Sequence, residues 1–286
     1  MQSADRELHV TGANLKEVQS RQPIRFYCRQ MWDLRHFILA QARSNAFKAG
    51  RDSFLGKTWI VLDPLLQVAI YLVVFGLILK ASRGMDNYVG FLVVGVTFFG
   101  MISKGITSGI GSIQKFRGLI SAFKFPRATL PIASVISQGL NNSVPAIIAI
   151  VLSLSLQIGT PIGFGILAII PIYLLLHTFI LGIDFWVSKI TALIPDLGSL
   201  VNVIVRGLFF LSGVFFSVER FDTHPSLKLL IEINPIYQFL TVARDAILDS
   251  SIPSLEVSLY LLLWSGILLV SGFVAFWLGE EKYAQV

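Results

Sequence analysis

The sequence predicts an all-α integral membrane protein with six transmembrane helices, and three observations lead to this class. Hydrophobic residues make up 54% of the 286 residues, charged residues make up 14%, and the mean hydropathy is +0.72; a soluble domain has about 25% charged residues. Six apolar runs each reach the length of about 20 residues that a membrane-crossing helix needs. The positive charges gather beside these runs, so the net charge of +6 indicates membrane orientation and not nucleic-acid binding.

The segment before the first run is polar and basic. Residues 1–22 carry no apolar core, so we expect no cleavable signal peptide. Residues 23–45 predict one amphipathic helix in the inner membrane interface, because apolar side chains recur at helical spacing among arginines. These apolar residues are Tyr27, Met31, Leu34 and Ile38. A soluble docking helix would show the same pattern.

The apolar runs and the charges between them predict the topology. We expect a cytoplasmic tail with the interface helix at 1–57 and a transmembrane domain at 58–286. The spans lie near 59–80, 88–110, 131–157, 162–186, 196–218 and 254–278. The chain up to Lys57 has ten basic and five acidic residues, and 111–127 has four basic residues and no acid. The segment 219–253 has three basic and five acidic residues. Because Lys and Arg favour the cytoplasmic side, both termini should be cytoplasmic.

Residues 111–127, between the second and third runs, predict a short basic amphipathic helix. Its apolar face comprises Ile113, Phe116, Leu119, Ile120 and Phe123, which recur at spacings of three and four. Its basic residues are Lys115, Arg117, Lys124 and Arg127. Pro126 disfavours helix at Phe125, so the helix should stop there. The segment is either a loop lying on lipid headgroups or a helix that docks into another protein and moves the membrane part.

The segment 219–253 is largely apolar although we place it on the outer side. Asn234 and Pro235 interrupt it, which predicts two short helices that cap or re-enter the outer leaflet. A plain amphipathic surface loop is the alternative.

Charged and aromatic residues inside the spans are the candidate pathway residues. Lys104 lies near the inner end of the second span and can extend toward the interface. Asp184 should pair with Lys189, and Arg206 should face the protein interior, because an intramembrane charge needs a partner or water. Paired aromatic rings could line a path and stack on sugar rings, although each could equally pack in the core or against lipid. These pairs are Phe98 and Phe99, Phe209 and Phe210, and Phe215 and Phe216.

Signals for catalysis and for a cofactor are weak. The four histidines are scattered without metal-ligand spacing, so we expect no metal. The stretch 50–58 resembles a phosphate-binding loop but has five residues between its glycines where four are needed, so we expect no ATP site on this chain. An enzyme in the membrane would have to use Asp63, Asp184 or Asp196.

Several short motifs in order resemble the ABC-2 type permease family, and within it the Wzm-like polysaccharide exporters of the O-antigen and galactan type. The likeness covers about residues 30–278. Its motifs are Leu55-Gly56-Lys57-Thr58-Trp59, Pro64-Leu65-Leu66, Val74-Phe75-Gly76, Tyr88-Val89-Gly90-Phe91-Leu92, Leu119-Ile120, Phe125-Pro126-Arg127, Asn234-Pro235 and Arg244-Asp245. The sequence departs from the family at Asp63, where relatives usually have glutamine before the proline.

The resemblance implies a transporter subunit and not an enzyme. A six-span subunit would form a homodimer in the bacterial inner (plasma) membrane with two separate subunits that bind ATP and Mg. It would export a polyprenyl-pyrophosphate-linked polysaccharide. Residues 111–127 would be the coupling helix, with Ile113, Phe116, Arg117, Leu119, Ile120 and Phe123 contacting the ATPase.

We expect three further sets of residues to contact the substrate at successive points of its path through the membrane. The pyrophosphate would be attracted by Arg43, Lys48, Arg51 and Lys57, since cations form charge-assisted hydrogen bonds with phosphates. The glycan would pass Phe98, Phe99, Arg206, Phe209, Phe210, Phe215 and Phe216. The outer gate would comprise Asn234, Pro235 and Tyr237.

Three other functions fit parts of the same pattern. A teichoic-acid or capsule exporter would share every feature. A membrane-embedded glycan-modifying enzyme would need an acidic site facing the interface. A channel or secondary transporter would usually show internal repeats, which we do not find.

Overall fold

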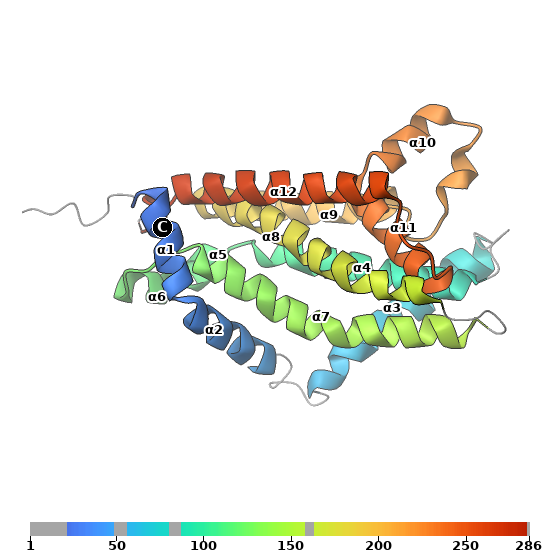
Figure 1. The fold of residues 1–286 in the computed structure, drawn as a ribbon, viewed down its shortest axis with the longest axis horizontal. Helices are drawn as coiled ribbons and strands as arrows, with labels where there is room; N and C mark the ends of the chain where they lie inside the picture. Colours follow the sequence, from blue (N-terminus) through green and yellow to red (C-terminus); the bar gives the residue numbers. More distant parts are fainter. Residues whose placement is uncertain (1–21, 49–55, 80–86, 158–162, 285–286) are drawn as a thin grey trace, which may run out of the picture.

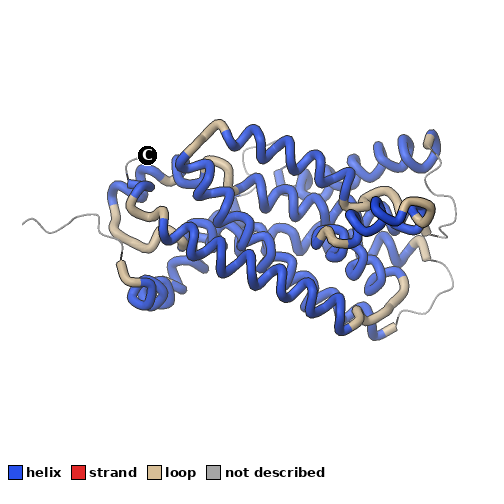
Figure 2. Tube along the Cα trace, turned by 90° about the horizontal axis from the view of Figure 1, so that it is seen from above, coloured by secondary structure: helices blue, strands red, loops and turns tan. Residues whose placement is uncertain are grey.

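The protein is a bundle of helices (Figure 1). The computed structural model describes residues 22–48, 56–79, 87–157 and 163–284. Within these ranges every regular element is helical, and Figure 2 shows helices joined by loops, with no strand. The long helices are α3 (Trp59–Tyr71), continued by the π-helical segment η3 (Leu72–Ile78), α4 (Tyr88–Ser108), α7 (Thr129–Ser155), α8 (Ile169–Leu193) and α12 (Leu255–Leu278). The shorter helices are α1 (Ile24–Asp33), α2 (Arg35–Lys48), α5 (Ser112–Lys115), α6 (Arg117–Ala122), α9 (Leu197–Leu211), α10 (Pro225–Glu232) and α11 (Pro235–Leu248). Short turns are η2 (Gly56–Thr58), η4 (Phe164–Ala168), η5 (Val218–Phe221) and η6 (Lys282–Ala284).

Five helical segments of the described chain are long and apolar enough to cross a membrane. They are Val61–Ile78, Tyr88–Ser108, Thr129–Ser155, Phe164–Leu193 and Leu255–Leu278. The expected span at 196–218 contains only α9, a helix of 15 residues. Length and composition therefore support five of the six predicted spans.

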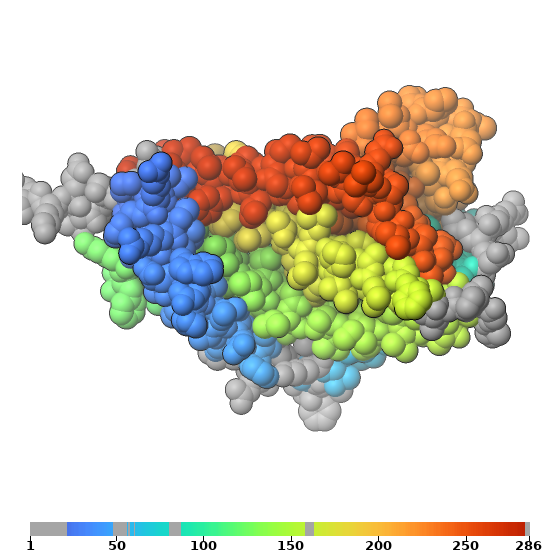
Figure 3. All heavy atoms as spheres, viewed as in Figure 1, coloured from blue at the N-terminus to red at the C-terminus, as the bar shows by residue number. Residues whose placement is uncertain are grey.

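Helix α4 is the centre of the bundle and α3 lies at its edge. Of the residues in the apolar window of α4, 72% are buried, against 6% for α3. Helix α12 packs along α8, and α2 packs along α7 (Figure 1). In Figure 3 the surface of α12, in red, runs along one edge, and α10 protrudes from the bundle at one end. Helices α1, α5 and α6 lie at the opposite end, together with the C-terminal turn (Figure 1).

The N-terminal segment forms two helices instead of the one that its periodicity predicts. Helix α1 ends at Asp33, Leu34 has φ −85° and ψ 6°, and α2 begins at Arg35. Tyr27 and Ile38 are buried against the bundle. The break turns α2 so that it follows α7, and Phe26, Trp32 and Phe37 stay exposed as an interface helix requires.

The segment 111–127 is also broken, so the expected single helix that ends near Phe125 is wrong. Helix α5 ends at Lys115, Phe116 makes a turn with φ −102° and ψ 14°, and α6 ends at Ala122. Phe123 is already extended, with φ −133° and ψ 142°. Pro126 therefore lies in the non-helical connection to α7.

Two helices flank Asn234 and Pro235 in the segment 219–253. The Asn234 side chain accepts a hydrogen bond from the amide of Ile236 at 3.0 Å, and Pro235 occupies the first helical position, as in an ordinary helix start. Helix α11 is buried by the bundle, with Phe239 and Leu240 almost fully covered.

The irregular backbone that follows α9 is held by three side chains from elsewhere. The Arg244 guanidinium donates to the carbonyl of Val214 at 2.9 Å, and the Tyr88 hydroxyl donates to the carbonyl of Phe215 at 3.2 Å. The Asn234 amide donates to the Ser212 hydroxyl at 2.9 Å. Non-helical backbone within a membrane protein needs such partners, because lipid offers none.

Candidate functional site

A groove of about 380 Å³ lies between α3 with η3, α4 and α9. Most of its wall is aromatic or aliphatic, and the polar residues of its lining are two neutral side chains and one cation. The lining residues are Gln67, Tyr71, Phe75, Val96, Phe99, Gly100, Ser103, Val205, Arg206, Phe209 and Phe210. The groove is therefore apolar with one positive charge.

One face of α3 changes from polar to aromatic along the groove. Asp63, Gln67, Tyr71 and Phe75 follow one another at intervals of four residues, which places them on the same side of the helix. Phe75 stacks on Phe215 with ring centroids 4.0 Å apart and planes within 5°. The groove thus has a polar end near Asp63 and an aromatic end near Phe75.

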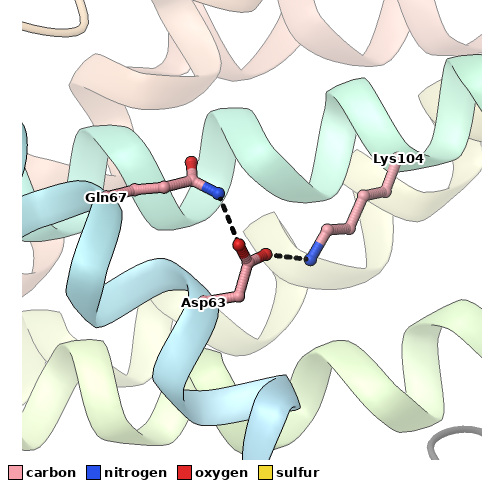
Figure 4. A network of polar contacts seen from close by, with 3 residues as sticks. All are labelled: Asp63, Gln67 and Lys104. Carbon is pink, nitrogen blue, oxygen red and sulfur yellow. Dashed lines mark hydrogen bonds and ion pairs between the residues drawn. The ribbon is translucent and has the colours of Figure 1, made fainter.

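The polar end carries an ion pair between two helices (Figure 4). The Lys104 ammonium on α4 lies 3.1 Å from Asp63 Oδ2, and the Gln67 amide donates to Asp63 Oδ1 at 3.0 Å. The Lys104 and Asp63 side chains are 59% and 43% exposed. Both partners of the pair are therefore partly open to another ligand.

Arg206 is the cation of the groove itself. Its Nε donates to the carbonyl of Asn202 on the same helix at 3.3 Å, and the side chain is exposed. Within the described ranges no carboxylate lies at ion-pair distance from it. The prediction that Arg206 faces the protein interior is therefore wrong for the single chain, because Arg206 presents to the groove a positive charge that has no acid partner among the described residues.

The structure brings together four of the seven residues predicted for the glycan path. Phe99, Arg206, Phe209 and Phe210 line the groove. Phe98 is buried in the main core with 1% exposure and is not among the lining residues. Phe215 is buried behind Phe75, and Phe216 packs on Phe221. Sequence reasoning missed Gln67, Tyr71 and Phe75, although their four-residue spacing from Asp63 could have indicated them.

The residues expected to attract pyrophosphate are only partly described. Arg43 lies on α2 with an exposed side chain. The side chains of Lys48 and Lys57, and the whole of Arg51, lie outside the described residues. Their common location therefore stays a prediction.

The segment 111–127 divides into a buried and an exposed part. Ile113 and Ile120 are 1% and 8% exposed and pack in a small core with Tyr27, Phe276 and Tyr283. These two isoleucines hold the segment to the bundle and do not face outward. Phe116 and Leu119 are half-buried.

The outward surface of this segment consists of Lys115, Arg117, Phe123 and Lys124. Phe123 is 65% exposed, so this surface combines one large apolar side chain with three positive charges. We call it the basic surface.

Contacts with both chain ends fix the position of this segment. The Arg127 amide donates to Glu280 Oε1 at 3.1 Å, and its guanidinium donates to the Glu280 carbonyl. The amide of Ala128 donates to the Tyr27 hydroxyl at 3.0 Å. Burial is the main cause that raises the pKa of Glu280 above its ordinary value. The basic surface is thus coupled to α1 and to the end of α12.

At the other end of the bundle, the predicted gate residues form one junction. Asn234 and Pro235 begin α11, and Tyr237 is buried, with 7% exposure. A Cβ on Gly213, which has φ +60°, would lie 2.9 Å from the Tyr237 ring. The gate role of these residues stays a prediction.

The acids considered for catalysis lie apart. Asp63 pairs with Lys104, while Asp184 is buried and accepts a hydrogen bond from Ser108 at 3.1 Å. Lys189 lies over the ring of Trp186, so the expected pair with Asp184 is wrong; residues five apart on a helix do not share a face. Asp196 is exposed before α9. Among the described residues no group of three side chains could hold a metal ion.

Comparison with known proteins decides the family. A model described as ABC-2 type transporter matches residues 37–248, which is most of the chain. This chain belongs to the ABC-2 type transporter family. It is therefore a multi-pass membrane subunit of a transporter and not an enzyme.

Named ABC-2 relatives are similar over nearly their whole length. The O-antigen export system permease protein RfbA of Myxococcus xanthus is 22% identical over 263 residues, covering 90% of this chain and 97% of the relative. A protein of the same name from Klebsiella pneumoniae is 23% identical over 239 residues, covering 82% and 89%. The polysialic acid transport protein KpsM of Escherichia coli is 23% identical over 231 residues, covering 79% and 87%.

Proposed function

We propose that this ABC-2 protein is the transmembrane subunit of an ATP-driven exporter that moves a polyprenyl-pyrophosphate-linked polysaccharide, of O-antigen or galactan type, from the cytoplasm across the inner membrane. The relatives named for O-antigen export and polysialic acid transport support a polysaccharide as substrate. Both termini lie in the cytoplasm in this proposal, because the basic segments up to Lys57 and at 111–127 favour the cytoplasmic side.

The exposed charges of the groove are the observation that carries this proposal. Asp63, Lys104 and Arg206 have exposed or half-exposed side chains on three helices that border the groove. A charged side chain at membrane depth is costly in contact with lipid. These residues should therefore contact water, substrate or protein. A second copy of the chain facing this groove would enclose a path between the two subunits.

Helix α9 provides the sixth crossing in this proposal. Its 15 residues are followed by the irregular segment 212–217, whose polar groups are bonded by Tyr88, Asn234 and Arg244. A short helix can belong to a complete membrane crossing when the non-helical backbone that follows it is covered by protein, because the polar groups of that backbone then have partners.

The basic surface docks onto a separate ATP-binding subunit. The chain has no ATP-binding motif of its own that we can identify, and ATP with Mg would be bound by that partner. Phe123 offers an apolar anchor, with Arg117 and Lys124 beside it. Contact with Glu280 and Tyr27 then transmits its movement to α12 and α1.

Capsule export is the second candidate. The likeness to the polysialic acid transport protein favours it over teichoic-acid export. It shares the same groove and the same docking surface, so the transported glycan distinguishes the two.

The docking surface is tested by Phe123→Asp. We expect loss of the ATP-binding subunit from the affinity-purified complex and loss of glycan export, because a charge replaces the anchor. Phe164→Asp is the matched control, since Phe164 is 89% exposed at the other end of the bundle. The Ile120→Asp change is unsuitable, because Ile120 is buried in the fold. Full co-purification of the Phe123→Asp variant would refute this docking surface.

A further inference from the structure

The ion pair at the polar end of the groove has properties of an exchangeable contact. It joins α3 to α4 at 3.1 Å, and both side chains remain about half exposed (Figure 4). In the part of the chain that the structure describes, the other ion pair, Lys228 with Asp222, lies in the outer segment and joins no spans. A new ligand can therefore reach Lys104 without unfolding the bundle.

Gln67 connects this pair to the groove and to its second cation. Its amide donates to Asp63 at 3.0 Å, and the same residue lines the groove with Ser103 and Arg206. Lys104 follows Ser103 directly on α4. Arg206 thus lines the groove without an acid partner among the described residues, and Lys104, which Asp63 occupies, lies next to the groove through Gln67 and Ser103.

We propose that Asp63 is an exchangeable latch on Lys104, which a pyrophosphate group displaces in order to lie between Lys104 and Arg206. A pyrophosphate carries more negative charge and more acceptor oxygens than one carboxylate, so it binds two cations better than Asp63 binds one. The idea rests on the proposed function and identifies the part of the substrate that enters the groove first.

The same phosphate chemistry occurs in three sources, namely a lipid-linked pyrophosphate, an anionic phospholipid and free pyrophosphate. We assign the site to the lipid-linked form, because the wall beyond the two cations is aromatic and aliphatic. Such a wall suits an attached sugar or isoprenoid better than a free ion.

The test uses the complete complex with its ATP-binding subunit in phosphatidylcholine nanodiscs. Binding of polyprenyl pyrophosphate is measured by native mass spectrometry. Asp63→Asn should lower the Kd, because Lys104 becomes free. Lys104→Gln and Arg206→Gln should raise it. We expect about tenfold in each direction, or about 1.4 kcal/mol. Lys228→Gln breaks the outer ion pair and should leave the Kd unchanged.

The opposite changes in Kd that we expect for Asp63→Asn and Lys104→Gln distinguish a latch from a contact that only stabilises the fold. If the pair only stabilises the bundle, Asp63→Asn and Lys104→Gln must act in the same direction, and this result would overturn the proposal. Equal binding of phosphatidylglycerol or of free pyrophosphate would overturn the assignment to a lipid-linked pyrophosphate.

Failure of the latch and failure of the proposed function give different results. A wild-type complex that binds polyprenyl pyrophosphate with the same Kd as all three groove variants refutes the latch alone. A wild-type protein that neither recruits an ATP-binding subunit nor binds this lipid refutes the proposed function and the latch with it.

Discussion

At the scale of single residues, Arg244 shows how this fold accommodates a buried charge. The side chain is 4% exposed, and its guanidinium carbon lies 3.5 Å from the centroid of the Phe91 ring. It donates to the carbonyls of Val214 at 2.9 Å and of Phe91 at 3.3 Å. Carbonyl oxygens and an aromatic face replace the carboxylate that a buried arginine usually needs. Arg244 therefore stabilises the irregular backbone that follows α9 by donating a hydrogen bond to it.

Replacing Arg244 with Met should destabilise the protein strongly. The change leaves the buried carbonyl of Val214 without this donor, at a cost of about 1–3 kcal/mol, and it also removes the contact with Phe91. Thermal unfolding of the purified protein in detergent measures the effect. Arg206→Met is the matched control, because Arg206 is exposed and bonds only within its own helix among the described contacts. Equal unfolding temperatures for the two variants would contradict the role given to Arg244.

At the scale of helices, α8 and α12 make the most extensive contact among the described helices. A Cβ added to Gly272 would lie 2.3 Å from the carbonyl oxygen of Gly182, and one added to Gly182 would lie 2.5 Å from the backbone of Leu268. Glycine at both positions lets the two backbones touch, as in many membrane helix pairs.

Gly272→Val should force these two helices apart. We expect a loss of about 1–3 kcal/mol, the usual cost of overpacking, seen as a lower unfolding temperature. Gly266→Val on the same helix is the control, because no atom lies within 4 Å of its added Cβ. A variant at Gly272 as stable as the control would show that α8 and α12 can separate freely.

The helical elements also show what the sequence could predict. Hydrophobic runs identified the long helices, because burial in lipid or core requires continuous apolar residues. The breaks at Leu34 and Phe116 carry no proline and follow from packing on α7 and on the small core around Tyr27. The end of α9 at Leu211 does have a local signal in Gly213, which has φ +60°, but the prediction missed it because apolar residues resume at Val214 and continue to Phe216.

The groove was only partly predictable because it joins three helices. Periodicity identifies the face of one helix but does not tell which faces meet. Phe98 and Phe99 show the limit: both rings are buried in the main core, and the sequence could not tell which of them reaches the wall of the groove.

At the scale of the whole molecule, the two ends of the bundle and the groove carry different kinds of residues. Lys115, Arg117, Phe123 and Lys124 form the basic surface at one end, while α10 and α11 occupy the other (Figure 1). Between them, the groove face carries charges that lipid would not tolerate. This distribution suits a subunit that contacts a partner at one end and a second copy along its side.

The proposed second copy can be tested by cross-linking. In a Cys28→Ser background, which removes the single cysteine, Val203→Cys should yield cross-linked dimers in membranes. Val203 is 59% exposed and lies one turn from Arg206 on α9. Leu262→Cys on α12, with a side chain 58% exposed, is the control and should stay monomeric. Cross-linking at Leu262 alone would place the partner on a different face.

The shortness of α9 has a consequence for the surrounding bilayer. Its 15 residues extend about 22 Å along the helix axis, whereas the hydrocarbon layer of a membrane is about 30 Å thick. In the proposed crossing the irregular segment 212–217 covers the remaining depth, so lipid on this side does not have to thin at a cost for each ångström of mismatch. Transport should therefore depend little on the length of the lipid tails around this helix.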